Sequence, residues 1–196
     1  MAGKTKERIL DAALDLFSQK GYEGTNLQEI ADAVGIVKSA LYRHFESKEE
    51  LWNSLIDKMI EYYDKGFGTP DRLPDIPESS DELIDLTMHM VGFTVNDDKV
   101  IKMRKIILTE QFRDERVRSL ATKHFNTGLE TIFEKIFSKM MENGLIRQDD
   151  PEMLAFAFTT PISSLIHLCD REPDKIEETI GKIKAFTEHF VKTYFA

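Results

Sequence analysis

The stretch GYEGTNLQEIADAVGIVKSALYRHFESKEEL, residues 21–51, decides the fold. It holds two short helical patterns of about eight residues each, which Gly35 separates. Thr25 is expected to cap the first of them, with Gln28 at the third helical position, and Ser47 to cap the helix that follows the second. Helices this short bury little surface and are marginal alone, so they must pack on something longer.

A longer amphipathic helix precedes this stretch. Apolar residues recur at helical spacing from Ile9 to Phe17 and predict a helix over residues 4–20, which Gly21 ends. Two short helices joined by a tight glycine turn and packed on a longer helix suit a helix-turn-helix. In that motif the second short helix, here residues 38–45, enters the major groove of DNA and its first residues reach base edges.

The rest of the chain repeats the helical spacing and shows no alternating pattern of a strand. Prolines gather in residues 66–80, which we predict to be a loop, and Asp150-Pro151 is a strong helix start. The fold class is therefore all-α with about nine helices, an N-terminal three-helix helix-turn-helix domain being followed by a helical C-terminal domain. After the loop, the predicted helical segments cover residues 80–94, 97–112, 114–142, 151–169 and 173–194.

The charge of the chain is acidic overall and basic in one place. Hydrophobic residues make up 41% and charged residues 31% of the chain, which is enough for a core, and the formal net charge is −9. This excludes a protein that coats nucleic acid through its overall charge. Between Lys38 and Lys48, however, the three cations Lys38, Arg43 and Lys48 stand against the single acid Glu46, and residues 4–8 add a basic arm.

Several functional classes find no support in the residues. Cys169 is the one cysteine, so neither an intrachain disulfide nor a cysteine-built zinc site is expected. The N-terminal residues do not form a secretory signal, and we find no apolar stretch of about 18 residues, so we expect a cytoplasmic protein without a membrane partner. No pattern of a catalytic set, a metal site or a phosphate loop occurs, so we expect no enzyme and no cofactor.

Three segments resemble a known family. Gly21 to Thr25, Ile30 to Ile36 and Leu41 to Leu51 are similar to the DNA-binding domain of the TetR (tetracycline repressor) family, and the resemblance is dense over residues 6–55. It implies a ligand-responsive transcriptional regulator, most often a repressor. Such a protein binds a palindromic double-stranded DNA operator as a homodimer and is released by a small apolar or amphipathic effector. The implied domains are residues 1–47 for DNA binding and residues 48–196 for ligand binding and dimerisation.

The resemblance also assigns residues to the DNA. By position, Thr25 caps the second helix and faces a phosphate, Tyr42 and His44 approach the backbone or the bases, and Lys48 binds a phosphate.

The chain departs from the family at two positions of the third helix. Val37 and Ala40 stand where the family often has a hydroxyl residue, and valine neither caps a helix nor binds a phosphate with its side chain. Base reading therefore rests on Lys38 and Ser39, with Ala40 against a thymine methyl group.

Apolar residues in the C-terminal part predict an effector pocket and a dimer interface. The last two helices carry apolar faces, among them Phe158 and Phe190, that would pair with their symmetry mates or would simply bury within the monomer. The pocket candidates share apolar character and helical spacing, which are also typical of core: Met88, Phe93, Met103, Ile107, Phe112, Phe125, Leu129, Phe133, Phe156 and Thr160. The alternative function is an all-α small-molecule binder or enzyme whose N-terminal helices no longer bind DNA.

Overall fold

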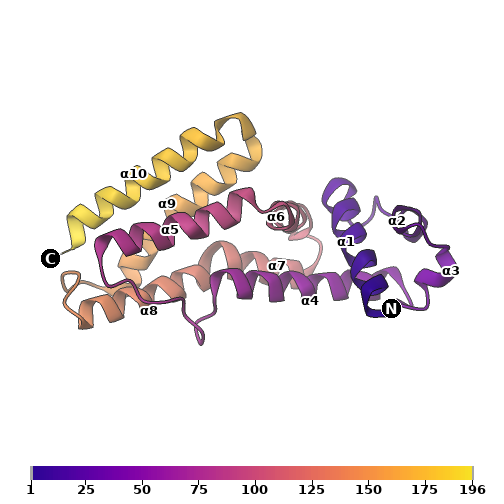
Figure 1. Ribbon diagram of the computed structural model, residues 1–196, viewed down its shortest axis with the longest axis horizontal. Helices are drawn as coiled ribbons and strands as arrows, with labels where there is room; N and C mark the ends of the chain where they lie inside the picture. The colour runs from indigo at the N-terminus through magenta and orange to yellow at the C-terminus, as the bar shows by residue number, and fades with distance from the viewer. Residues whose placement is uncertain (1, 196) are drawn as a thin grey trace. The chain divides into compact units, whose positions relative to one another are not determined.

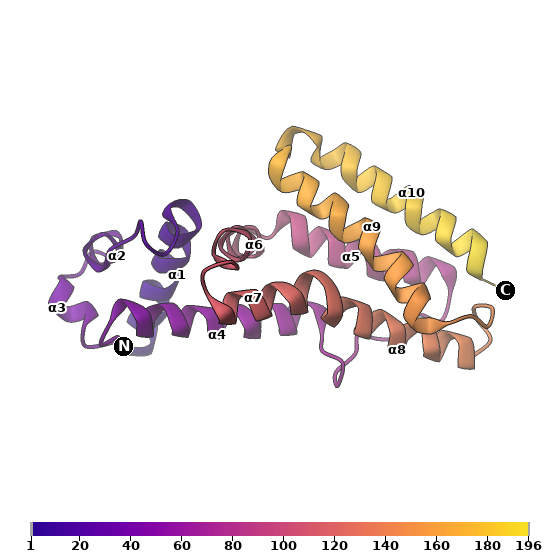
Figure 2. The same ribbon diagram turned by 180° about the vertical axis from the view of Figure 1, so that it is seen from behind.

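The computed structural model describes residues 2–195, and the chain is all-α as predicted (Figures 1 and 2). Within those residues no strand forms, and the extended pairing is limited to two isolated bridges. The helices are α1 (Ala2–Lys20), α2 (Leu27–Val34), α3 (Lys38–Leu41), α4 (Lys48–Phe67), α5 (Ser80–Asn96), α6 (Asp98–Glu110), α7 (Glu115–Thr122), α8 (Gly128–Glu142), α9 (Pro151–Arg171) and α10 (Ile176–Tyr194). A π-helical segment, Lys123–Thr127, joins α7 to α8, so this predicted long helix is continuous and the described residues hold nine helices.

The chain divides into two compact units. The N-terminal unit comprises Met1–Tyr62 and Lys102–Ala121, and the C-terminal unit comprises Tyr63–Ile101 and Thr122–Ala196. Helices α4 and α6 each contribute residues to both units. The functional boundary that we expect after residue 47 stays a prediction.

The ends of α2 follow from its capping residues. The predicted cap at Thr25 is wrong by one residue, because the Asn26 side chain accepts the backbone N–H groups of Gln28 and Glu29 at 2.9 and 3.1 Å. Glu29 closes the capping box by accepting the N–H of Asn26 at 3.0 Å. At the other end Gly35 takes the left-handed conformation, φ 72°, and stops the helix as predicted.

Helix α3 is shorter than the sequence predicts. It covers Lys38–Leu41, and a turn replaces helix over the following residues to Phe45. Val37 precedes it and offers no side-chain cap, which removes one support that a longer helix would have. Leu41 and Phe45 are both buried, as their spacing of four predicts, so the turn still packs its apolar side inward.

Aromatic rings tie the helix-turn-helix to the start of α4 within the N-terminal unit. The Trp52 ring lies 5.0 Å from Phe17 of α1 and 5.1 Å from Tyr22 of the following turn, measured between centroids. The indole N–H of Trp52 donates to Asp114 at 2.8 Å, which satisfies the one polar group of this buried side chain. The short helices thus gain through packing the stability that their length does not supply.

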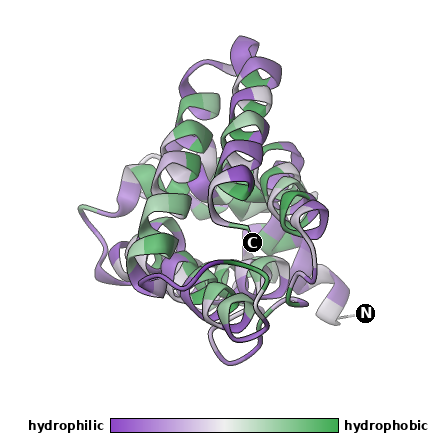
Figure 3. Ribbon diagram, turned by 90° about the vertical axis from the view of Figure 1, so that its left-hand side faces the viewer, coloured by the Kyte–Doolittle hydropathy of each residue, from purple (hydrophilic) through white to green (hydrophobic). Residues whose placement is uncertain are grey.

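In the C-terminal unit, α5, α8, α9 and α10 bury a phenylalanine cluster. Phe133 and Phe137 of α8 meet Phe158 of α9 and Phe190 of α10, with ring centroids 4.6–5.7 Å apart. Figures 1 and 2 both show α9 and α10 side by side, and Figure 3 shows apolar and polar residues sharing each helix. Phe158 and Phe190, which lie on the apolar faces that predicted a dimer, are buried within the monomer, so these two side chains are not free to pair with a second copy.

Helix α9 starts as its sequence predicts. Asp150 caps it by accepting the N–H groups of Glu152 and Met153, and Pro151 occupies the first turn. Among the described residues α9 is the one helix with the length and mean hydropathy that a membrane span would need, although the sequence led us to expect none. It also supplies six buried residues to its unit, as core helices of this composition do.

The π-helical segment places a histidine in an apolar site. The His124 ring stacks on Tyr63, with centroids 4.3 Å apart, and its Nε2 atom is buried without a hydrogen-bond partner. Burial, and secondarily the neighbouring Lys123, lowers the pKa of His124 from 6.5 to about 4, although Asp64 acts in the opposite direction. Lys123 itself is paired with Asp64 at 2.7 Å.

We predict that His124 makes the folded state sensitive to acid. In the unfolded chain this histidine binds a proton near pH 6.5, whereas in the folded chain its pKa is about 4, so the free energy of unfolding falls as the pH falls between these values. At pH 5 the loss amounts to about 2 kcal/mol. Urea unfolding of His124→Gln should show a shallower acid limb, while His189→Gln, at an exposed position of α10, keeps the limb of the original chain. Identical limbs in all three proteins would contradict the prediction.

Candidate nucleic-acid interface and effector cavity

The surface of α3 is polar and open, as the helix-turn-helix prediction requires. Lys38 and Ser39 are exposed, Ala40 and His44 are half-buried, and Tyr42 is 45% exposed. These side chains surround the inward-facing Leu41, which leaves them on the outside of the N-terminal unit. The arrangement presents hydrogen-bond donors and one small apolar side chain from a single short element.

Thr25 differs from the other predicted DNA contacts. Its side chain is 1% exposed, and its hydroxyl donates to the Gly21 carbonyl oxygen at 3.0 Å. The side chain is thus committed to the interior of the turn, and the exposed Asn26 occupies the helix start in its place.

Three lysines of this region lie over aromatic rings. The amino group of Lys48 is 4.2 Å from the centroid of Tyr22, that of Lys6 is 5.1 Å from Phe45, and that of Lys38 is 6.0 Å from Tyr42. Among residues 2–195 none of the three lysines forms an ion pair. A ring attracts a cation without cancelling its charge, so the positive charge of these lysines is not neutralised by the contact.

Four other cations of the N-terminal unit are paired with carboxylates. Lys20 binds Glu29 at 2.5 Å and Lys102 binds Asp15 at 2.6 Å. Two further pairs, Lys58 with Asp11 and Arg116 with Asp57, follow the same pattern. Lys38 and Lys48, in contrast, are cations without a carboxylate partner at α3 and at the start of α4.

The turn that leads into the helix-turn-helix is held by a buried carboxylate. Glu110, at the end of α6 and 4% exposed, accepts the backbone N–H of Tyr22 at 3.0 Å. Gly21 has φ 71°, and a Cβ atom there would lie 2.7 Å from Glu110 Oε1. The glycine is needed both for the left-handed backbone and for the approach of the carboxylate.

A small cavity lies in the C-terminal unit. Its volume is about 30 Å³, and its walls come from α5, α8, α9 and the last residue of α4. Three threonines face it, Thr87, Thr94 and Thr159, and each hydroxyl donates to the carbonyl four residues earlier in its own helix at 2.7–2.9 Å. The cavity is therefore apolar in practice, because its hydroxyl protons are already used.

The predicted pocket residues separate into several places. Leu129 and Phe133 line the cavity, and Met88, Phe93 and Phe125 are half-buried in the same unit. The other five lie elsewhere: Met103 and Ile107 are buried in the N-terminal unit, Phe112 is 82% exposed, Phe156 is 49% exposed and Thr160 is exposed.

Much of the cavity wall was not predicted from the sequence. Phe67 and one face of α5, with Thr87, Val91 and Thr94, line the cavity but were not among the predicted residues. Their spacing along α5 is helical, so the periodicity was available, but threonine counts as polar in a search for apolar residues. Among residues 2–195 no group of three His, Cys, Asp or Glu side chains is placed to hold a metal ion.

Comparison with known proteins agrees with the helix-turn-helix geometry. Residues 9–55 match the family described as bacterial regulatory proteins, tetR family. Residues 9–55 therefore form a DNA-binding domain of the TetR type. The HTH-type negative transcriptional regulator IcaR of the biofilm operon icaADBC of Staphylococcus epidermidis is 41% identical over 58 residues, which are 30% of this chain and 31% of that protein. The chain thus matches about a third of the length of this TetR-family relative, and the similarity lies in the DNA-binding domain.

Solved structures show that the TetR fold extends over the whole chain. A crystal structure assigned to the TetR family, from Mesorhizobium loti MAFF303099, matches with a TM-score of 0.71 at 22% identity and covers 100% of this chain and 99% of that one. AibR, solved in complex with isovaleryl coenzyme A and operator DNA, matches with a TM-score of 0.64 at 25% identity over 93% of this chain and 97% of that one.

We predict that Gly21→Ala destabilises the chain by about 1–3 kcal/mol, because alanine is strained at this φ and its methyl group displaces the Glu110 carboxylate. Gly35→Ala is the matched control, since Gly35 has φ 72° but open space around its Cβ position. Thermal unfolding should therefore show a larger loss at Gly21 than at Gly35. Equal losses would mean that the contact with Glu110 contributes nothing beyond the backbone strain.

Proposed function

We propose that the protein is a ligand-responsive transcriptional repressor that binds an operator as a homodimer. The observation that carries the proposal is the set of ring-held, uncompensated lysines around α3 in an otherwise acidic chain. Cations that lack a carboxylate partner are free to displace counterions from DNA phosphates. The acidic remainder of the surface repels DNA and limits docking to this face.

Each residue of the interface has a proposed role. Lys38 and Ser39 donate to base edges in the major groove, and Ala40 contacts a thymine methyl group. Tyr42 and His44 contact the backbone or adjacent bases, and Lys48 binds a phosphate. We leave Thr25 out of the interface, since its side chain is buried and its hydroxyl is already bonded.

We expect Lys48→Gln to weaken binding to every duplex by a similar factor and to lower the salt slope of the affinity by about one, because one phosphate contact is lost. Lys20→Gln is the control, since the charge of Lys20 is already paired with Glu29. Fluorescence anisotropy with the DNA upstream of the gene itself, over a series of salt concentrations, measures both quantities.

The same titration tests the proposal as a whole. Specific binding that falls steeply with salt supports the regulator. An absence of specific binding to DNA would instead favour the all-α small-molecule binder or enzyme. A slope that is unchanged in Lys48→Gln would remove Lys48 from the interface.

We propose that the dimer forms through the exposed side of α9, together with α10. Met153 and Phe156 are among the few large apolar side chains exposed in the chain, and the small or polar residues Ala157, Thr160 and Ser164 continue the same side of α9. A stripe of this kind on a helix suits an isologous contact, in which the same residues of two copies meet across a two-fold axis. A palindromic operator requires such an axis.

We predict that Phe156→Glu converts the dimer into a monomer at micromolar concentration, because two carboxylates would then face each other in an apolar contact. Light scattering after size exclusion reports the mass directly. Phe112→Glu is the control, since Phe112 is also an exposed phenylalanine but belongs to the N-terminal unit. Dissociation by both variants, or by neither, would argue against an interface on α9.

We further propose that an effector bound in the C-terminal unit alters the DNA-binding face through α4. Lys48 begins this helix and Phe67, which lines the small cavity, ends it. A ligand changes the DNA affinity only if it binds the DNA-competent and DNA-incompetent states with different affinities. Release of the operator on binding of a small apolar or amphipathic molecule is the expected response.

A further inference from the structure

Exposed apolar side chains gather at α3. In the part of the chain that the structure describes, the large apolar side chains that face solvent are Val37, Tyr42, Phe112, Met153 and Phe156. The first two directly precede and follow the four residues of α3. Single apolar residues scattered over a surface are ordinary, but two beside one short element need a reason. The roles proposed above account for Tyr42 and leave Val37, which is 68% exposed, without one.

Valine is a locally unfavourable residue at position 37 for two reasons. The side chain has no polar group, so its exposure leaves an apolar surface in water. It also forms no cap hydrogen bond at the start of α3, where serine or threonine would form one. A position at which both solvation and helix capping disagree with the residue present is expected where a residue serves binding rather than folding.

The backbone holds Val37 in a defined place. Its carbonyl oxygen accepts the N–H groups of Ala40 at 2.8 Å and Leu41 at 3.3 Å, and its conformation is extended, with φ −74° and ψ 147°. The preceding N–H, that of Ile36, donates to the Ala31 carbonyl oxygen of α2 at 3.0 Å. Because a β-branched side chain also has few rotamers, Val37 loses little entropy when it contacts a partner.

Ala40 and Val37 together form a small apolar patch within a cationic surface. The hydrogen bond between their backbones brings the two residues together, and Ala40 is half-buried. A valine and an alanine offer far less area than a stable protein interface buries. The exposed Lys38 and Ser39 lie between them in the sequence, and Lys38 has no carboxylate partner. The size of the patch and the charge beside it therefore favour a nucleic acid over a protein surface.

The major groove of DNA offers one apolar group to such a patch. Its base edges carry hydrogen-bond donors and acceptors, and the 5-methyl group of thymine is the exception. We infer that Val37 is a specificity-determining residue that reads a thymine methyl group beside the one assigned to Ala40. This inference rests on the proposed function, because it requires α3 to lie in the major groove. It adds to that function the base that each half-site of the operator must carry.

An exchange of thymine for uracil tests the methyl contact. Selection from random duplexes with the full chain first gives the half-site. Each thymine of one half-site is then replaced in turn by 2′-deoxyuridine, which lacks the methyl group and keeps every hydrogen-bonding group of the base. Fluorescence anisotropy should show that the exchange at the position of Val37 weakens binding about fourfold, because burial of one methyl group is worth about that factor.

Variants at position 37 assign the contact to its side chain. Val37→Ser should bring the ratio of the affinities for the thymine and uracil duplexes at that position to about one, and Val37→Ile should keep it at about four. The ratio is the readout, because the cap and the hydroxyl that serine adds act on both duplexes alike. Lys48→Gln is the control, since loss of a phosphate contact weakens both duplexes and leaves their ratio unchanged.

Several outcomes would overturn the inference and leave the regulator standing. They are a selected half-site without thymine, a ratio of about one at every thymine in the original chain, and a thymine preference that Val37→Ser leaves intact. A preference that is lost in Ala40→Gly and kept in Val37→Ser would assign all methyl reading to Ala40 and reject a role for Val37. An absence of specific binding to any duplex would reject both this inference and the proposed function.

Discussion

The hydrogen bond from the Tyr22 backbone to the buried Glu110 carboxylate is the constraint on which the N-terminal unit depends. A buried carboxylate is costly unless it is bonded, and here its partner is the N–H of a turn rather than a mobile side chain. The turn must then carry glycine at position 21, where φ is 71° and a Cβ atom would lie 2.7 Å from the carboxylate. The ring of Tyr22, whose backbone is fixed in this way, contacts the ring of Trp52 and the amino group of Lys48. One polar contact thus orders both the packing and the charge of this unit.

The local signals in the sequence predicted most of the fold. Gly35 and Asp150 end and start their helices as predicted, because each capping rule involves one or two neighbouring residues. The predicted cap was Thr25 and the observed cap is Asn26. Both residue types can cap a helix, and Thr25 does not because its side chain is buried. The burial of a side chain depends on residues far away in the sequence, which capping rules based on neighbouring residues do not include.

The cavity was harder to predict for the same reason. Helical spacing marks which residues turn inward, but it does not say whether a neighbour fills the space that they face. Met103 and Phe133 have equivalent patterns and lie in different units. The threonines of the cavity wall were not predicted for a second reason. A threonine hydroxyl that donates to its own helix behaves as an apolar group, although threonine is classed as polar in the sequence. Chemical type in the sequence and chemical behaviour in the fold differ at these positions.

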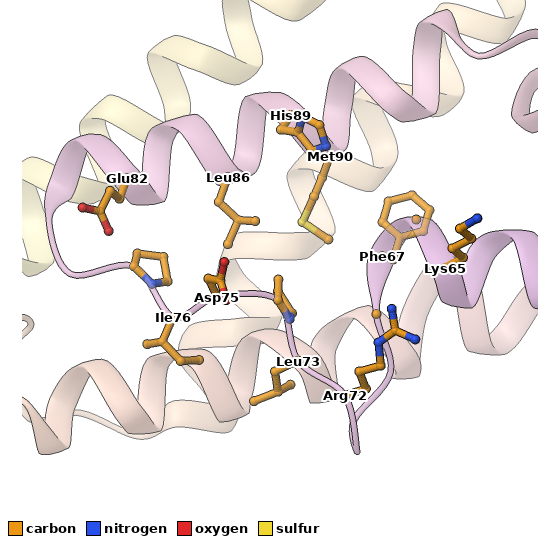
Figure 4. A pocket seen from close by; sticks show the side chains of 14 residues that line it. Lys65, Phe67, Arg72, Leu73, Asp75, Ile76, Glu82, Leu86, His89 and Met90 are labelled. Carbon is orange, nitrogen blue, oxygen red and sulfur yellow. The ribbon is translucent and has the colours of Figure 1, made fainter.

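The loop of residues 68–79 has a consequence for the divergence of related chains. It forms one wall of an open cleft of about 480 Å³, whose other walls are the end of α4 and α5 (Figure 4), and Pro77 is its only buried residue. Substitutions at exposed loop positions generally change stability by no more than about 0.5 kcal/mol, so the shape and charge of this wall can drift without endangering the phenylalanine core. The helices α8, α9 and α10, in contrast, are bound to one another through ring contacts that tolerate few changes of volume. Selection for a new small molecule would therefore act first on the exposed residues of this loop, which are Asp71, Arg72, Asp75 and Glu78.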